Sequence, residues 1–122
     1  MNSNTPHPAL DPLIQHPTRL AITAFLSGCA EAEFSTVRDG CQVSDSALSK
    51  IVATLEAASY VKARKGYVGK RPRTWLSLTG QGRTALAGHL AALQRIAANA
   101  ATLGSTLTDT STQDTDSSAH DR

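Results

Sequence analysis

Apolar residues recur at helical spacing in three stretches of the chain, and each stretch predicts one amphipathic helix. The first begins after Pro17, which suits the first turn of a helix, and the second begins after Ser44, a strong N-cap. The third follows Thr79, a second cap, and its apolar steps of four and three residues form a heptad-like seam. The apolar positions of the three helices are Ile22, Phe25, Leu26 and Cys29, then Leu48, Ile51, Val52 and Leu55, then Leu86, Leu90, Leu93, Ala97 and Ala100.

Two further stretches predict shorter elements. Residues 30–35 allow a strand of one or two residues that pairs with a later hairpin, and Ser35 can cap a short helix through Asp39. Residues 61–78 alternate partly between apolar and polar positions, which predicts two short strands. A wide turn between these strands is predicted from residues that permit or restrict unusual backbone angles, namely Gly66, Gly69 and Pro72.

The predicted hairpin at residues 61–78 is strongly basic. It contains no acidic residue and the cations Lys62, Arg64, Lys65, Lys70, Arg71 and Arg73. The formal net charge of +2 understates this, because the stretch 109–122 holds four aspartates against Arg122 alone. A run of charge is ordinarily a solvated face. Here, uncompensated cations on two strands would repel one another, and nucleic-acid phosphates would relieve that repulsion.

Length and composition indicate one small domain. The 122 residues are 40% hydrophobic and 4% aromatic, so the core must be built mainly from aliphatic residues and alanine. A core of this kind is marginal alone, and association of two subunits is a usual remedy. The seam of the third helix favours such a dimer contact, while packing wholly on its own domain is the alternative.

The composition divides the chain into three parts. Residues 1–11 predict a flexible N-terminal arm, residues 12–103 a folded domain, and residues 104–122 a disordered acidic tail rich in Ser and Thr. No stretch approaches the roughly 18 apolar residues that span a membrane, and no apolar leader opens the chain, so the cytoplasm is the expected location.

Candidate chemistry for catalysis or metal binding is sparse. Cys29 and Cys41 are interpreted first as small core residues, with thiol-based sensing as the alternative. Together with His16 and His89 they form no recognisable ligand set. Since no nucleophile, acid–base pair or phosphate loop stands out, we expect no enzyme, no cofactor and no metal.

Three blocks of sequence resemble bacterial winged-helix regulators of the MarR/ArsR-like superfamily, most closely the compact single-domain group. The match runs from Leu10 to about Leu93 and rests on the blocks LDPLIQHPTRLAI, FSTVRDGCQVSDSALSKIVATLEAASYV and KARKGYVGKRPRTWLSLTGQGRTAL. The middle block is the most specific. Two positions depart from the pattern: Gln42 stands where glycine is common, and Gly80 replaces a common proline.

The resemblance implies a mainly α fold with a small antiparallel β-wing, a winged helix-turn-helix with a C-terminal dimerisation helix. It also implies a recognition helix at about 44–59 in the major groove and a basic wing at about 61–78 on the backbone or minor groove. Carried over residue by residue, the DNA contacts would be Asp45, Ser46, Ser49, Lys50, Arg64, Lys65, Lys70, Arg71 and Arg73. The dimer interface would comprise Leu86, Leu90, Leu93, Ala97 and Ala100.

The expected function is that of a DNA-binding transcriptional regulator, a repressor acting as a homodimer on a palindromic operator in double-stranded DNA. A small-molecule effector, if there is one, is expected at the dimer interface. The alternative is a winged helix that contacts another protein, with the basic hairpin docking on an acidic partner.

Overall fold

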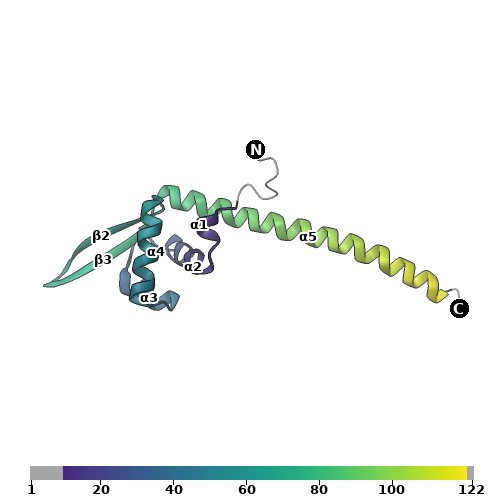
Figure 1. The fold of residues 1–122 in the computed structure, drawn as a ribbon, viewed down its shortest axis with the longest axis horizontal. Coiled ribbons are helices and arrows are strands. Elements are labelled where there is room, and N and C mark those ends of the chain that lie inside the picture. Colours follow the sequence, from purple (N-terminus) through teal and green to yellow (C-terminus); the bar gives the residue numbers. More distant parts are fainter. Residues whose placement is uncertain (1–9, 121–122) are drawn as a thin grey trace.

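The computed structural model describes the backbone of residues 10–120 and the side chains of residues 10–108. It confirms a mainly helical fold with a small antiparallel sheet (Figure 1). The sheet has the strand order β1-β3-β2. The elements are α1 Pro12–Gln15, α2 Pro17–Ser27, β1 Ala32–Glu33, α3 Phe34–Cys41, α4 Asp45–Ala57, β2 Val61–Val68, β3 Arg71–Leu78 and α5 Gly80–His120.

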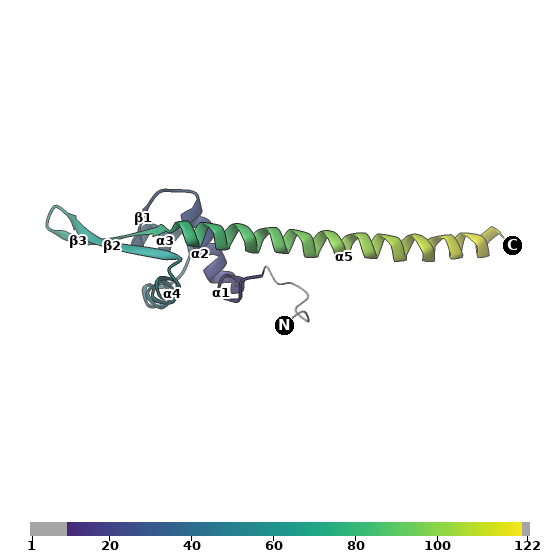
Figure 2. The same ribbon diagram turned by 90° about the horizontal axis from the view of Figure 1, so that it is seen from above.

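The molecule is elongated because two elements leave a small helical body in opposite directions. The β2–β3 hairpin projects from one end, and α5 continues far beyond the other helices at the opposite end (Figures 1 and 2). The predicted short strand at residues 30–35 is confirmed as β1, which pairs with β3 at the foot of the hairpin. At the foot of the hairpin, β3 therefore pairs with β2 on one side and with β1 on the other, and β1 anchors the hairpin to the body.

The core lies where α1, α2, α3 and α4 meet the foot of the sheet and the first turns of α5. It is aliphatic, as the composition predicts, and its fully buried side chains include Ile14, Ile22, Leu26, Val37, Leu48, Leu55 and Leu76. Cys29 and Cys41 are free thiols that pack half-buried against this core. Burial raises the pKa of the Cys41 thiol, which disfavours the reactive thiolate.

The hairpin has the predicted bounds, but its strands are longer and its turn is tighter than the sequence suggests. Each strand has eight residues, and the pairing continues without interruption to Val68 opposite Arg71. The turn is therefore the pair Gly69 and Lys70, so the predicted wide turn is wrong. Gly69 has a φ of +62°, the backbone angle that a two-residue hairpin turn demands at its first position and that glycine adopts most easily.

Two of the three predicted helix caps are confirmed. The hydroxyl of Ser44 accepts a hydrogen bond from the amide of Ala47 at 3.1 Å, and that of Thr79 accepts one from Gly82 at 2.9 Å. The predicted cap at Ser35 is wrong. Strand β1 leads directly into α3, so Glu33 takes the N-cap position without a side-chain hydrogen bond, and Ser35 lies inside the helix.

The connection between α3 and α4 requires a left-handed residue. Gln42 ends α3 with a φ of 56° and a ψ of 50°. Glycine adopts this conformation at no steric cost, whereas a side chain carries a penalty of about 1 kcal/mol. The position at which the resemblance expects glycine is therefore one where the backbone favours it, and Gln42 makes the turn less stable.

Asp11, the last residue of the predicted N-terminal arm, contacts the folded body. Asp11 caps α1, and its carboxylate accepts hydrogen bonds from Leu13 and from the hydroxyl of Tyr60 at 2.5 Å. Its amide donates to Nδ1 of His89, which is 1% exposed. Asp11 therefore joins α1 to α5 and to the start of the hairpin. Residues 1–9, the rest of the predicted arm, lie outside the described residues.

Helix α5 has a buried first part and an exposed continuation. Leu86 is 5% exposed and belongs to the core, whereas every residue from 97 to 108 is exposed. Of the residues in the predicted seam, Leu86 is therefore part of the core, and Leu90 is the first that is exposed at the surface. The helix also passes the predicted boundary at residue 104 and ends at His120. Disorder of residues 104–122 stays a prediction, and the side chains from 109 onward lie outside the described residues.

Candidate nucleic-acid interface

The first turns of α4 present short polar side chains to solvent. Ser46, Ser49 and Lys50 are exposed, while Leu48, Val52 and Leu55 bury the opposite face. Asp45, the first residue of the helix, is also exposed and pairs with Arg38 of α3 at 2.9 Å. The sequence correctly separates the two faces of this helix, and the outer face has room for close approach to a groove wall.

A hollow of about 670 Å³ separates the start of α4 from the hairpin. Asp45 and Ser49 line it on the helix side, and Lys65, Arg73 and the tip residue Tyr67 line it on the strand side. Four of the nine predicted DNA contacts therefore meet across one open space. The other five, Ser46, Lys50, Arg64, Lys70 and Arg71, lie outside its lining.

The pairing register assigns the cations of the hairpin to two faces. Residues opposite one another share a face, so Lys65 lies with Thr74 on the face of Ala63 and Leu76, which pack against the core. Arg64 lies on the other face, opposite Trp75. Adjacent cations in the sequence thus point to opposite sides of the sheet.

On the outer face, Arg64 is held by an acid and an aromatic ring. Its Nε and Nη2 donate to the two carboxylate oxygens of Glu31 at 3.0 and 2.8 Å, and its guanidinium lies 4.3 Å from the centroid of the Trp75 ring. The hydrogen bond to Arg64 lowers the pKa of Glu31, so this carboxyl stays ionised at neutral pH. The bidentate pair and the ring together fix the guanidinium.

A second acid compensates Arg73, whose Nε lies 3.3 Å from Glu33 Oε1 in β1. The interpretation of the hairpin as a set of uncompensated cations is therefore wrong for Arg64 and Arg73. The neutralising acids come from the segment around β1, thirty or more residues earlier in the sequence. Both pairs are partly exposed, so they orient the arginines more than they stabilise the fold.

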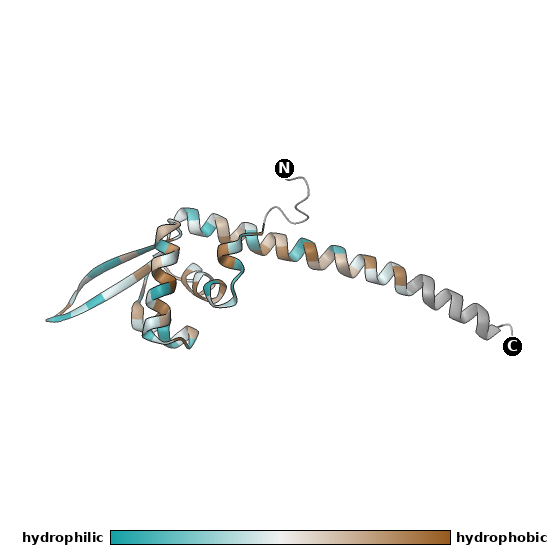
Figure 3. Ribbon diagram, in the orientation of Figure 1, coloured by the Kyte–Doolittle hydropathy of each residue, from teal (hydrophilic) through white to brown (hydrophobic). Residues whose placement is uncertain are grey.

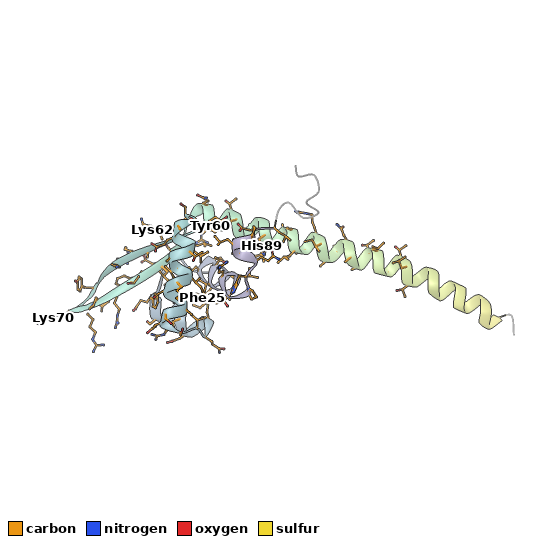
Figure 4. All side chains as sticks on the ribbon, in the orientation of Figure 1. Phe25, Tyr60, Lys62, Lys70 and His89 are labelled. Atoms are coloured by element: carbon orange, nitrogen blue, oxygen red, sulfur yellow. The ribbon has the colours of Figure 1, made fainter. Side chains whose placement is uncertain are left out.

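The far end of the hairpin keeps its cations unpaired. Lys65, Lys70 and Arg71 form no ion pair with any described residue, and all three are exposed. Lys70 stands at the extreme end of the hairpin, whereas Lys62 lies at its foot (Figure 4). Hydrophilic residues also dominate along the hairpin (Figure 3). Lys70 and Arg71 thus extend unpaired at the end of the hairpin, and Lys62, at its foot, has no ion pair with a described residue either.

The sequence reasoning missed Arg38, Glu31 and Glu33. Arg38 bridges Asp39 and Asp45, both at 2.9 Å, and these carboxylates raise the pKa of its guanidinium. Arg38 lines the hollow because α3 crosses α4 there, and this crossing cannot be predicted from the sequence. Glu31 and Glu33 did leave a signal, because they flank Ala32 with the period of a strand.

The described part of the chain offers little for other chemistry. No group of three or more His, Cys, Asp or Glu residues in it is placed to hold a metal ion. Its helices also include none with the length and apolar character needed to cross a membrane.

Comparison with known proteins agrees with this geometry. The family model described as "Winged helix DNA-binding domain" matches residues 18–97. No curated protein matches the sequence. Among solved structures, a transcriptional regulator homologue from Pyrococcus horikoshii OT3 is 26% identical with a TM-score of 0.67, over 71% of this chain and 86% of that one.

Two more distant structures share the fold. PcaV from Streptomyces coelicolor, solved with its natural ligand, is 16% identical with a TM-score of 0.62, over 72% of this chain and 61% of its own. The M. tuberculosis regulator MosR, solved with DNA, is 19% identical with a TM-score of 0.61, over 77% of this chain and 67% of its own. The chain thus spans less than two thirds of the length of PcaV.

Proposed function

Because the chain belongs to the winged helix DNA-binding domain family, we propose that it is a transcriptional regulator that binds duplex DNA through α4 and the β2–β3 wing. The observation that carries this proposal is the shared placement of the two elements. The exposed start of α4 and the wing residue Lys65 line one open hollow, and Lys70 and Arg71 extend beyond it unpaired. Such an arrangement suits a helix in the major groove and a wing on the phosphates beside it.

Within this interface, we assign the two elements different tasks. Ser46, Ser49 and Lys50 lie on the exposed face of α4, where side chains reach base edges and adjacent phosphates. Lys65, Lys70 and Arg71 supply affinity and orientation through phosphate contacts. Arg64 and Arg73 hold the wing in place through Glu31 and Glu33, and we remove them from the predicted contacts.

We propose that the protein acts as a homodimer. Leucines of α5 that lie on or beyond the edge of the core are exposed, namely Leu90 at 40%, Leu93 at 37%, Leu103 at 61% and Leu107 at 60%. Apolar residues recur along the helix outside the body (Figure 3). Large exposed apolar side chains on one helix are typical of an interface. A twofold dimer would place two wings and two α4 helices on a palindromic operator.

The dimer is tested by substituting one exposed leucine. Leu103→Glu places a charge in the proposed seam, and we expect the dissociation constant of the dimer to rise at least about tenfold. Thr102→Glu adds the same charge on the opposite face of α5 and serves as the matched control. Sedimentation equilibrium measures both. Equal association constants for the two variants would exclude this seam as the dimer contact.

The DNA assignment is tested by retardation of random duplex DNA at several salt concentrations. Binding that weakens steeply as salt rises supports the proposal, because released counterions drive phosphate contacts. The second candidate, docking on an acidic protein, is favoured by the polar, charged lining of the hollow. Failure to retard any duplex, even at low salt, would support that candidate and exclude the proposed function.

Selection of bound fragments from the source genome then identifies the operator. We expect two half-sites related by a twofold axis and separated by about one helical turn, 10–10.5 base pairs. A dimer on such a site would obstruct transcription from an overlapping promoter, so repression is the effect we propose. A reporter whose expression rises when the protein is removed would establish repression, and a fall would establish activation.

We also propose that an effector, where one acts, binds between the subunits. The structurally similar regulator PcaV was solved with its natural ligand. In the present chain, the hollow beside α4 is open to solvent and lined by several charged side chains, which makes it poorly suited to a small organic ligand. The exposed apolar residues of α5 provide the more suitable surface once two copies meet.

A further inference from the structure

We propose that Asp45 is a specificity-determining residue, which selects cytosine in the major groove, and that Arg38 is a positioning residue that holds its carboxylate in place. The inference rests on the proposed function, since it requires α4 to enter the groove. Asp45 and Arg38 would then determine which DNA sequence is bound, whereas the cations of the wing would contribute to affinity for any sequence.

Asp45 is exposed and yet held at one oxygen. Its side chain is 72% exposed at the first position of α4, and its Oδ1 accepts a hydrogen bond from Nη1 of Arg38 at 2.9 Å. Arg38 is in turn fixed by Asp39, whose Oδ1 accepts from its Nε at 2.9 Å. Oδ2 of Asp45 accepts no hydrogen bond from the described residues. One oxygen is therefore anchored, and the other is available to a donor outside the protein.

The surroundings of Asp45 leave room for a base edge. The hollow of about 670 Å³ opens beside it, with Ser49 one turn farther along α4 and Lys65 on the opposite wall. A DNA strand that passes through this space can place a phosphate near Lys65 while a base edge faces the start of α4. The carboxylate would meet the base side, because Asp45 and Ser49 lie four residues apart on one face of the helix.

The chemistry of a carboxylate then selects the base. A carboxylate only accepts hydrogen bonds, so it requires an amino group, which in the major groove belongs to cytosine or adenine. Beside the amino group of adenine lies the acceptor N7, which repels a second carboxylate oxygen. Beside that of cytosine lies a C–H group, which tolerates it. Cytosine is therefore the favoured partner.

An acid at position 45 is also unfavourable for DNA binding in general, which indicates that Asp45 has a specific role. A negative charge on a surface that approaches phosphates weakens binding to every sequence. An acid in the first turn does favour the helix dipole, but that role needs no partner in α3. The pair with Arg38 reduces the repulsion and restricts the carboxylate to one orientation, which is what readout of a base requires.

The test is selection of duplexes from a randomised library by the full chain and four variants. Wild type is expected to prefer cytosine at one position in each half-site, by about fivefold or more over other bases. Asp45→Asn should move that preference to adenine, since an amide both donates and accepts. Asp45→Glu keeps the charge and displaces the carboxylate, so the preference for cytosine at that position should disappear.

One variant of the positioning residue and one control complete the test. Arg38→Gln should weaken the preference at the same position, and Glu56→Gln, which removes an exposed acid at the other end of α4, should retain it. A preference that is unchanged in Asp45→Asn and Asp45→Glu would overturn the inference. So would tighter binding of Asp45→Asn to all sequences by one common factor, which is the result for an acid that only repels phosphates. Failure of wild type to bind any duplex is a separate outcome and overturns the proposed function itself.

Discussion

The base of the wing, residues 61–66 and 73–78, and its tip, residues 67–72, differ in what surrounds their charged side chains. At the base, Arg64 and Arg73 are paired with Glu31 and Glu33, and Trp75 lies beneath Arg64. At the tip, Lys70 and Arg71 are exposed and form no ion pair with a described residue. One basic run in the sequence thus contains two populations of cations.

The difference follows from the distance of each part from the helical body. The base is close enough to β1 for acids there to reach it, and its other face buries Val61, Leu76 and Leu78. The tip extends past every other element (Figures 1 and 2). No acid among the described residues pairs with Lys70 or Arg71 there. Arg64 and Arg73 at the base are therefore held within the fold, and we expect Lys70 and Arg71 at the tip to serve binding.

The largest expected effect tests the structural side of this comparison. Leu76 is fully buried beneath the sheet, so Leu76→Ala should lower the free energy of unfolding by about 2–5 kcal/mol. Val68→Ala at the tip removes a side chain that is 53% exposed, and we expect a change within about 0.5 kcal/mol. Chemical denaturation measures both. Similar losses for the two variants would mean that the tip is also packed.

The second effect tests the binding side. If Lys70 and Arg71 each contact a phosphate, the double variant Lys70→Ala/Arg71→Ala should reduce the magnitude of the slope of log K against log salt by about two. Affinity should fall uniformly across sequences, because phosphates carry no sequence information. Titrations of random duplex at several salt concentrations measure the slope.

A matched pair of substitutions at the base provides the control. Arg64→Gln/Arg73→Gln removes the same charge, yet the slope should stay close to that of wild type because these arginines are occupied by glutamates. A slope that changes equally for the two double variants would show that base and tip contact the DNA alike. A slope that changes for neither would exclude the wing from the interface.

Much of the fold was predictable because it depends on local patterns. The apolar periodicity around Leu48 and Leu55, the cap at Ser44 and the short strand before Phe34 all follow from neighbouring residues. The misjudged turn is also instructive. The sequence predicts Gly66 in the turn, but this residue lies within β2, where a Cβ atom would come within 3.0 Å of the Trp75 ring. Glycine there makes room for an aromatic, which the sequence alone does not disclose.

The candidate site was less predictable because it depends on contacts between distant segments. Glu31 is 33 residues from Arg64, and Asp11 is 78 residues from His89. The sequence identifies such residues as charged or polar but not as partners. The sequence therefore predicts the elements that carry the candidate interface, and it overestimates how many of their cations are free of ion pairs.

A third, smaller effect comes from releasing one arginine of the base. Glu33→Gln removes the acid that pairs with Arg73, so this arginine can turn to a phosphate and steepen the salt slope by about 0.9. Glu31→Gln removes the same charge, but Trp75 still holds Arg64, and the slope should change less. Identical slopes for the two variants would mean that the aromatic ring does not restrain Arg64.

The smallest effect contrasts the two tyrosines, Tyr60 at the base and Tyr67 at the tip. The hydrogen bond from Tyr60 to Asp11, together with burial and the negative charge, raises the pKa of Tyr60 above its ordinary value of 10.0. Because the folded pKa is raised, this contact stabilises the fold fully below pH 10, and the stabilisation is lost as pH rises through the folded value.

Tyr67→Phe leaves Tyr60 as the single tyrosine of the chain, so the phenolate absorbance of this variant titrates Tyr60 directly. Adding Asp11→Asn should lower the midpoint toward 10.0, since asparagine keeps the cap of α1 but loses the charge. Adding Asp39→Asn, a remote change of equal charge, should leave the midpoint of the Tyr60 titration unchanged. A midpoint unaffected by Asp11→Asn would mean that Asp11 does not anchor the base of the wing through Tyr60.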